Sequence, residues 1–239
     1  MEYLSKMKSY KKMISKGIIT LVFAASATVA SAQFSVGTDF VSSYVWRGFK
    51  QDLINTPQSP NIQPYVSYAI GGLTLGAWGS SSFTGTIKEV DLYATYAFTS
   101  AFSLTLTDYN WGFTQSYFKY NSGTDHIFEA TLAYAGTESL PLSASLNTMF
   151  AGNDTTTSGK QAFSTYVELG YQLADNAKVF VGGLLNDSQT YGIGAGVTNV
   201  GLKVTKSLEI TEKCCLPIYG VFGVNPVAKD AFIVFGITL

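Results

Sequence analysis

The sequence predicts an all-β protein, a transmembrane antiparallel up-and-down β-barrel of about twelve strands. Three observations support this prediction. Apolar and polar residues alternate with a period of two through almost the whole chain from residue 33 to residue 239, as they do in strands with two different faces. The alternating segments are about ten residues long, which is the length of a tilted strand that crosses a bilayer. The connectors between them are alternately short and long, which is typical of outer-membrane barrels.

Residues 1–32 have the pattern of a secretory signal peptide rather than of a folded element. Five lysines precede the apolar run GIITLVFAASATVA, and this run ends in the small residues 30–32. Such a pattern predicts an exported precursor that is cleaved between Ala32 and Gln33. A membrane anchor is the alternative, but the apolar run is shorter than the ~20 residues that a spanning helix needs. The barrel domain is therefore expected to comprise residues 33–239.

The composition excludes several classes of protein. Removal of the signal peptide takes away five lysines and Glu2, which leaves ten basic side chains, fifteen acidic side chains and a formal charge of −5. An acidic chain without a lysine-rich tract offers no surface for nucleic acid. Two cysteines, Cys214 and Cys215, are adjacent, so they cannot staple a small secreted domain. A vicinal disulfide and two free thiols are both compatible with the sequence.

The expected strands follow one another without a helical segment. The alternation predicts strands at residues 34–47, 61–70, 73–82, 88–98, 102–112, 125–135, 140–150, 162–173, 177–186, 192–210, 216–225 and 230–239. Connectors after the even-numbered strands are tight or rich in turn residues, and most connectors after the odd-numbered strands are longer and polar. An even strand number then places both ends of the barrel domain at the rim that carries the short turns.

The alternation also has the sense that a membrane barrel requires. One face of residues 88–98 is apolar, whereas the other face carries Glu89 and Asp91. Residues 140–147 likewise separate leucines from Ser143 and Asn147. Closure is the only way in which a sheet can satisfy its backbone inside a bilayer, so the apolar faces are expected to face lipid. An exported β-sandwich shares the alternation and is the alternative fold.

The only arginine of the chain, Arg47, stands at the end of the first predicted strand. By alternation, Arg47 and Asp39 face the lumen, whereas Tyr44 and Trp46 face lipid as part of an aromatic girdle. The same parity places four further acids in the lumen, namely Glu89, Asp91, Glu129 and Glu168. Because a guanidinium can bridge two carboxylates, Arg47 is expected to pair with Asp39 and an acid such as Asp91. That pairing would either brace the wall or shape a constriction that solutes contact.

Catalysis is not expected. Twelve-stranded barrels include the outer-membrane phospholipases. A resemblance to that class would imply a serine that is activated by a histidine. The single histidine, His126, has no serine beside it in the sequence, and no group that would orient it is evident. A lone histidine also argues against a histidine-based metal cluster. We therefore expect no enzyme activity, no metal and no cofactor.

The segment VGTDFVSSYVWRGFKQ, residues 36–51, contains an aromatic Arg-Gly core formed by Tyr44, Arg47 and Gly48. It resembles the opening strand of the TorF-like porins of Gram-negative bacteria, and EVDLYATYAF and NPVAKDAFIVFGITL are similar to that family as well. The resemblance spans the mature chain, although only the first segment is specific. It implies an outer-membrane barrel that forms a pore. One departure is Leu239, because outer-membrane barrels typically end in an aromatic residue.

These features predict a porin-like channel in the outer membrane of a Gram-negative bacterium, for passive diffusion of small hydrophilic solutes or ions. Its expected partners are outer-membrane lipid, the barrel-assembly machinery and those solutes, and no nucleic acid. The inward acids outnumber the inward bases, which include Lys178 and Lys203, so a pore would weakly prefer cations. A non-conducting barrel with a structural or adhesin-like role is the alternative.

Overall fold

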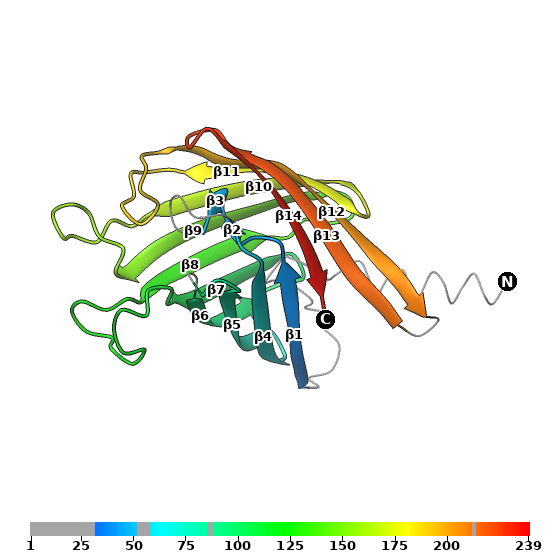
Figure 1. Cartoon of the computed structure of the whole chain (residues 1–239), viewed down its shortest axis with the longest axis horizontal. Coiled ribbons are helices and arrows are strands. Elements are labelled where there is room, and N and C mark those ends of the chain that lie inside the picture. The colour runs from blue at the N-terminus through cyan, green and yellow to red at the C-terminus, as the bar shows by residue number, and fades with distance from the viewer. Residues whose placement is uncertain (1–31, 52–57, 86–87, 212–213) are drawn as a thin grey trace.

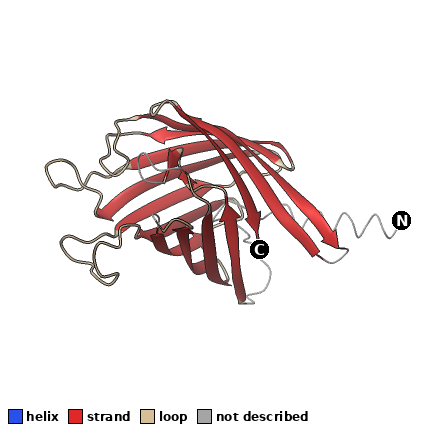
Figure 2. Ribbon diagram, viewed as in Figure 1, coloured by secondary structure: helices blue, strands red, loops and turns tan. Residues whose placement is uncertain are grey.

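The computed structural model describes residues 32–51, 58–85, 88–211 and 214–239, and its regular structure is entirely β (Figure 2). The predicted signal peptide lies outside these residues, apart from Ala32. Within the described ranges, no helix has the length and apolar character needed to cross a membrane.

Twelve long strands close into one antiparallel barrel (Figure 1). They are β1 (Gln33–Val41), β4 (Asn61–Ile70), β5 (Leu73–Ser82), β6 (Lys88–Ala97), β7 (Phe102–Tyr109), β8 (Ile127–Tyr134), β9 (Leu142–Gly152), β10 (Thr165–Ala174), β11 (Ala177–Leu184), β12 (Gly196–Thr211), β13 (Cys214–Asn225) and β14 (Asp230–Thr238). Two short strands, β2 (Val45–Trp46) and β3 (Phe49–Lys50), pair only with each other. Each barrel strand pairs with the next barrel strand in the chain, and β1 pairs with both β4 and β14. The predicted up-and-down barrel of about twelve strands is confirmed.

The connectors divide the barrel into two different rims. At one rim the described connectors are mostly tight, namely 71–72, 98–101, 135–141 and 175–176. The other rim carries the connectors 42–60, 83–87, 110–126, 153–164, 185–195 and 226–229, four of which are much longer. We call these the short-turn rim and the long-loop rim. The predicted alternation of connector lengths is therefore present, with a few exceptions in length.

The barrel is apolar on its outside and largely polar on its inside. On β6, Val90 and Leu92 are exposed, whereas Glu89 and Asp91 are buried. The other strands repeat this pattern, with Phe34 and Val36 among the most exposed apolar side chains on β1. A soluble barrel would have the opposite arrangement, because it must bury its apolar face.

The first strand ends earlier than expected. The prediction of one strand over residues 34–47 is wrong, because β1 stops at Val41, whose partner Asn61 is the first residue of β4. Beyond that point β4 offers no further backbone groups with which to pair. Ser42 still bonds to the backbone of Phe235, as donor at 2.8 Å and as acceptor at 2.9 Å. The chain then leaves the barrel wall and enters the lumen.

The barrel closes through a short seam between β1 and β14. Nine residues of β1 pair with β4, whereas only three, Asp39 to Val41, pair with β14. Reciprocal backbone hydrogen bonds between Thr38 and Leu239, at 3.0 Å and 2.9 Å, extend this seam by one residue. The seam is therefore concentrated in the half of β1 that is nearer the long-loop rim.

Candidate functional site

Residues 45–50 of the first long connector fold into the lumen as a small hairpin, which we call the lumenal hairpin. The pairing of β2 with β3 leaves Arg47 and Gly48 as a two-residue turn. Both have positive φ, 51° and 86°, as a type I′ turn requires. Glycine adopts this conformation readily, whereas for arginine it carries a cost in backbone energy. Contacts of the arginine side chain must therefore offset that cost.

Arg47 reaches across the lumen to Glu129 on β8. Its Nη1 and Nη2 donate to the two carboxylate oxygens at 2.6 Å and 2.7 Å, which is the bidentate geometry that makes arginine specific for carboxylates. Four strands separate β8 from β1 on one side of the barrel and six on the other. The ion pair therefore connects the hairpin to the nearly opposite wall. The Glu129 side chain is fully buried, and that of Arg47 is 11% exposed.

Aromatic rings enclose the guanidinium. Its central carbon lies 4.5 Å from the ring centre of Trp46 and 4.7 Å from that of Tyr166, which are cation–π distances. Nη1 also donates to the Tyr191 hydroxyl at 2.5 Å. The Tyr109 hydroxyl in turn donates to Glu129 at 3.0 Å. Such additional hydrogen bonds are the condition under which a buried ion pair can offset the desolvation of its charges.

The backbone of the turn and the side chain of Lys50 attach the hairpin to three further strands. Thr198 on β12 and Asn225 on β13 donate to the carbonyl groups of the two turn residues at 3.1 Å and 3.2 Å. The Lys50 ammonium contacts Asp230 on β14 at 2.9 Å. The hairpin is therefore attached to the wall at several separate places.

The wall has a local irregularity where it receives the turn. A register shift between β11 and β12 leaves both Thr198 and Asn199 buried, at 0% and 8% exposure. Such bulges commonly redirect side chains. A Cβ atom on Gly48 would lie 1.9 Å from the Thr198 carbonyl oxygen. Glycine is therefore required both by the φ angle of the turn and by its close approach to β12.

Trp46 and Tyr44 lie inside the barrel and do not form a lipid-facing girdle. Trp46 stacks on Tyr191, with ring centres 5.1 Å apart and ring planes 6° apart. Tyr44 is 8% exposed, and its ring centre lies 5.6 Å from that of Trp78. The girdle prediction is wrong because it continued the parity of β1 beyond Val41, where the chain leaves the wall.

The structure gives Arg47 a different partner from the expected ones. The side chain meets Glu129 rather than Asp39 or Asp91, because the hairpin crosses the lumen instead of following its own strand. Asp39 accepts a hydrogen bond from Thr238 Oγ1 at 2.6 Å, across the seam.

The other three predicted acids lie apart from this ion pair. Glu168 accepts hydrogen bonds from the Tyr166 hydroxyl at 2.7 Å and from Asn199 at 3.1 Å. Glu89 and Asp91 occupy neighbouring inward positions on β6 and are 5% and 6% exposed. The lumen thus contains one carboxylate bound by Arg47 and a separate acidic pair on β6.

Sequence reasoning missed the aromatic residues that surround Arg47. Tyr166 has the parity of Glu168, which alternation assigns to the lumen, so that parity was an available signal. Tyr191 lies in a long connector, 185–195, where no periodicity indicates which way a side chain points. Its role depends on tertiary packing alone.

His126 has an orienting group, contrary to expectation. Its Nδ1 lies 2.6 Å from Asp108 Oδ1, and its Nε2 lies 2.5 Å from the Tyr117 carbonyl oxygen. The ring is fully buried and stacks on Tyr120 with centres 4.2 Å apart. Both ring nitrogens are therefore engaged in holding the connector 110–126 against the barrel.

Comparison with known proteins does not assign a family. No protein-family model matches the chain, and no curated protein matches it at a significant level. The resemblance of residues 36–51 to the TorF-like porins therefore stays a prediction.

Proposed function

We propose that the protein is a channel in the outer membrane of a Gram-negative bacterium, through which small hydrophilic solutes or ions diffuse passively. The observation that carries this proposal is the polarity of the barrel, with apolar side chains exposed outside and polar side chains buried inside. In water this arrangement would leave a large apolar surface unpartnered. In a bilayer it matches lipid outside and a polar lumen inside.

The burial of inward side chains supports a lumen that narrows toward the long-loop rim. On β1, Val41 is buried, whereas Asp39 and Ser35 are partly exposed. On β4, Gln63 is buried and Ser67 is partly exposed. The lumenal hairpin lies at the buried end, so we propose it as the constriction of the channel.

Export and assembly follow from the same proposal. The signal peptide would direct the chain across the inner membrane and be cleaved after Ala32. The barrel-assembly machinery would then insert the strands into outer-membrane lipid. Transport through the finished barrel would require neither a cofactor nor an enzymatic step.

A non-conducting barrel with a structural or surface-binding role is the second candidate. The lumenal hairpin favours it, because Trp46 and Arg47 pack across the lumen against side chains of the opposite wall. A barrel of about twelve strands has a narrow interior, so one hairpin can obstruct much of it.

Recording in planar bilayers separates the two candidates. The starting material is protein from the outer-membrane fraction whose gel mobility changes on boiling. Discrete conductance steps support the channel, and Arg47→Ala should enlarge them by releasing the hairpin from Glu129. Lys50→Ala is the matched control, because it alters an exposed contact of the same hairpin. Absence of steps from wild type and from Arg47→Ala contradicts the channel, and a soluble periplasmic product contradicts the membrane location.

A further inference from the structure

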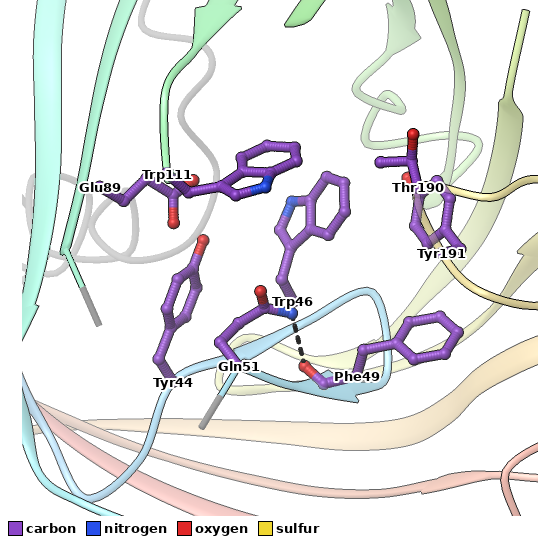
Figure 3. Close-up of a pocket in the computed structure, with 8 residues that line it drawn as sticks. All are labelled: Tyr44, Trp46, Phe49, Gln51, Glu89, Trp111, Thr190 and Tyr191. Carbon is purple, nitrogen blue, oxygen red and sulfur yellow. Dashed lines mark hydrogen bonds between the residues drawn. The ribbon is translucent and has the colours of Figure 1, made fainter. Parts of the chain in front are cut away.

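A cavity of about 110 Å³ lies between the lumenal hairpin and the barrel wall (Figure 3). Five aromatic side chains form most of its lining, and Glu89, Gln51 and Thr190 are its polar groups. Figure 3 shows Trp46 and Trp111 side by side, with the Tyr44 hydroxyl directed toward Glu89. The hairpin, β6 and two long-loop connectors thus contribute to one enclosure.

Glu89 lines this cavity, and the neighbouring acid Asp91 lies behind it on β6; neither is in a salt bridge within the described part of the chain. Glu89 and the adjacent inward Asp91 are more than nine-tenths buried. Asp91 Oδ1 has no hydrogen-bond partner among the described residues. Salt bridges in the described ranges involve other acids, and Arg47 is committed to Glu129. A buried carboxylate without a cation is costly, so this pair favours a positively charged ligand.

The aromatic lining restricts what kind of cation fits. Tryptophan and tyrosine attract cations through the electron-rich faces of their rings and also cover apolar groups. An inorganic cation would make little use of the apolar wall, and a neutral sugar would leave the two carboxylates without a counter-charge. A carboxylate-bearing ligand would be repelled by the carboxylates. A small organic cation satisfies both the rings and the acids.

We propose that this cavity is a binding site for a small organic ammonium ion, with its charged nitrogen at Glu89 and its apolar stem against Trp46 and Trp111. The inference rests on the proposed function, because such a ligand reaches the cavity through the lumen, and it names cationic amines as a solute class for the channel.

The polar groups of the cavity favour an ammonium that carries N–H donors over a quaternary one. The Gln51 amide nitrogen donates to the Phe49 carbonyl at 3.1 Å, which leaves its amide oxygen on the cavity side (Figure 3). The Tyr44 and Thr190 hydroxyls can also accept. A primary ammonium can therefore donate to Glu89 and to neutral oxygens together, whereas tetramethylammonium has no hydrogen to donate.

Tryptophan fluorescence of the folded barrel in detergent tests the proposal. Two of the three tryptophans line the cavity, so a bound ligand should change the emission. We expect a saturable change with n-butylammonium and a weaker response to tetramethylammonium. No saturable change is expected with n-butanol or butyrate, which have a similar stem without the positive charge. An equal response to n-butanol, or saturable binding of glucose instead, overturns the proposal.

Charge removal at the cavity provides the second arm. Glu89→Gln should weaken n-butylammonium binding by about 10-fold, the equivalent of one charge-assisted hydrogen bond. Asp91→Asn should weaken it less, because Asp91 acts at longer range. Glu138→Gln, an exposed acid on the short-turn rim, is the matched control and should bind as wild type does. Heat-dependent gel mobility confirms that each variant is folded. Unchanged binding by Glu89→Gln overturns the site.

The binding measurement is independent of conductance. Binding without conductance steps would support this site and contradict the channel. Conductance without n-butylammonium binding would contradict this site and leave the channel supported. In that case a proton shared between Glu89 and Asp91, rather than a bound cation, would neutralise the acidic pair.

Discussion

The two ends of the lumen differ in how firmly they are packed. At the long-loop end, hydrogen bonds of buried or part-buried groups join the hairpin to the barrel wall and the connectors to one another. Asp154 alone, fully buried, accepts from Ser164 and Thr190 and so joins two connectors. At the short-turn end, inward side chains such as Ser35 and Ser67 are partly exposed. The pairing of β1 with β14 does not extend to this end. This difference places the more firmly packed part of the lumen at the long-loop end.

The largest expected effect is at the buried ion pair of the long-loop end. Arg47→Ala leaves Glu129 buried without its cation, so we expect a loss of about 3–5 kcal/mol in the free energy of unfolding. Arg47→Lys keeps the charge without the bidentate geometry and should lie between this variant and wild type. Urea unfolding followed by gel mobility measures the loss.

The matched control for Arg47 is Lys50→Ala. Its ion pair with Asp230 has side chains 30% and 46% exposed, so its removal should cost at most about 1 kcal/mol. Equal losses from Arg47→Ala and Lys50→Ala would show that the packing difference between buried and exposed contacts has no energetic consequence. Glu129→Gln combined with Arg47→Ala should recover part of the loss, because no unpaired charge remains.

A second effect is expected at the tip of the hairpin. Gly48→Ala brings a Cβ atom into contact with the Thr198 carbonyl and adds strain at a φ of 86°, so about 3 kcal/mol should be lost. Gly159→Ala has a similar φ of 76° with no neighbour within 4 Å in the described part of the chain, and it should lose only on the order of 1 kcal/mol. If the two variants unfold alike, the close approach to β12 is not important for stability.

Ion selectivity should respond to the short-turn half of the lumen. Lys178 and Lys203 are Cα partners on β11 and β12, and Lys203 Nζ lies 4.8 Å from the Tyr219 ring centre. Replacing both lysines with glutamine removes two inward amines that can carry positive charge, so the predicted weak cation preference should increase. The reversal potential in a salt gradient measures this preference. An anion-selective wild type would contradict the predicted sign.

The smallest expected effect concerns pH at one connector. Hydrogen bonds from the Thr114 hydroxyl, and from the backbone N–H groups of Gln115 and Thr114, hold the pKa of Asp125 below its ordinary value of 3.8. A lowered folded-state pKa contributes stability above the ordinary value, and this contribution is lost as pH falls through the lowered one. Below pH 3.8, cleavage by pepsin within residues 110–126 should therefore increase, and Asp125→Asn should show the increase at higher pH as well.

Alternation was sufficient to predict the barrel, because a strand pairs with neighbours on both sides and its side chains must then face alternately in and out. β6 illustrates this, since Glu89 and Asp91 are buried and Val90 and Leu92 are exposed. The same reasoning failed at residues 42–47, where the pattern continues after pairing stops. The dipeptide Arg47–Gly48 was a turn signal, but a weaker one than Asn-Gly.

The partner of Arg47 could not be predicted from parity. Parity states that Asp39, Asp91 and Glu129 all face the lumen, but it does not state which acid a connector will reach. That choice depends on how far the hairpin projects and on the register shift that turns Thr198 and Asn199 inward. Both are properties of the closed barrel as a whole.

The contacts of the lumenal hairpin also have a consequence for the order of assembly. Arg47 and Glu129 are 82 residues apart in the chain, Arg47 and Thr198 are 151 apart, and Gly48 and Asn225 are 177 apart. Contacts between such distant residues form late, because the loop between them must first be ordered. The hairpin, which is synthesised directly after β1, would therefore be among the last parts of the barrel to reach its final position. The hairpin can therefore make its final contacts, including the ion pair between Arg47 and Glu129, only after β8, β10, β12 and β13 have been assembled.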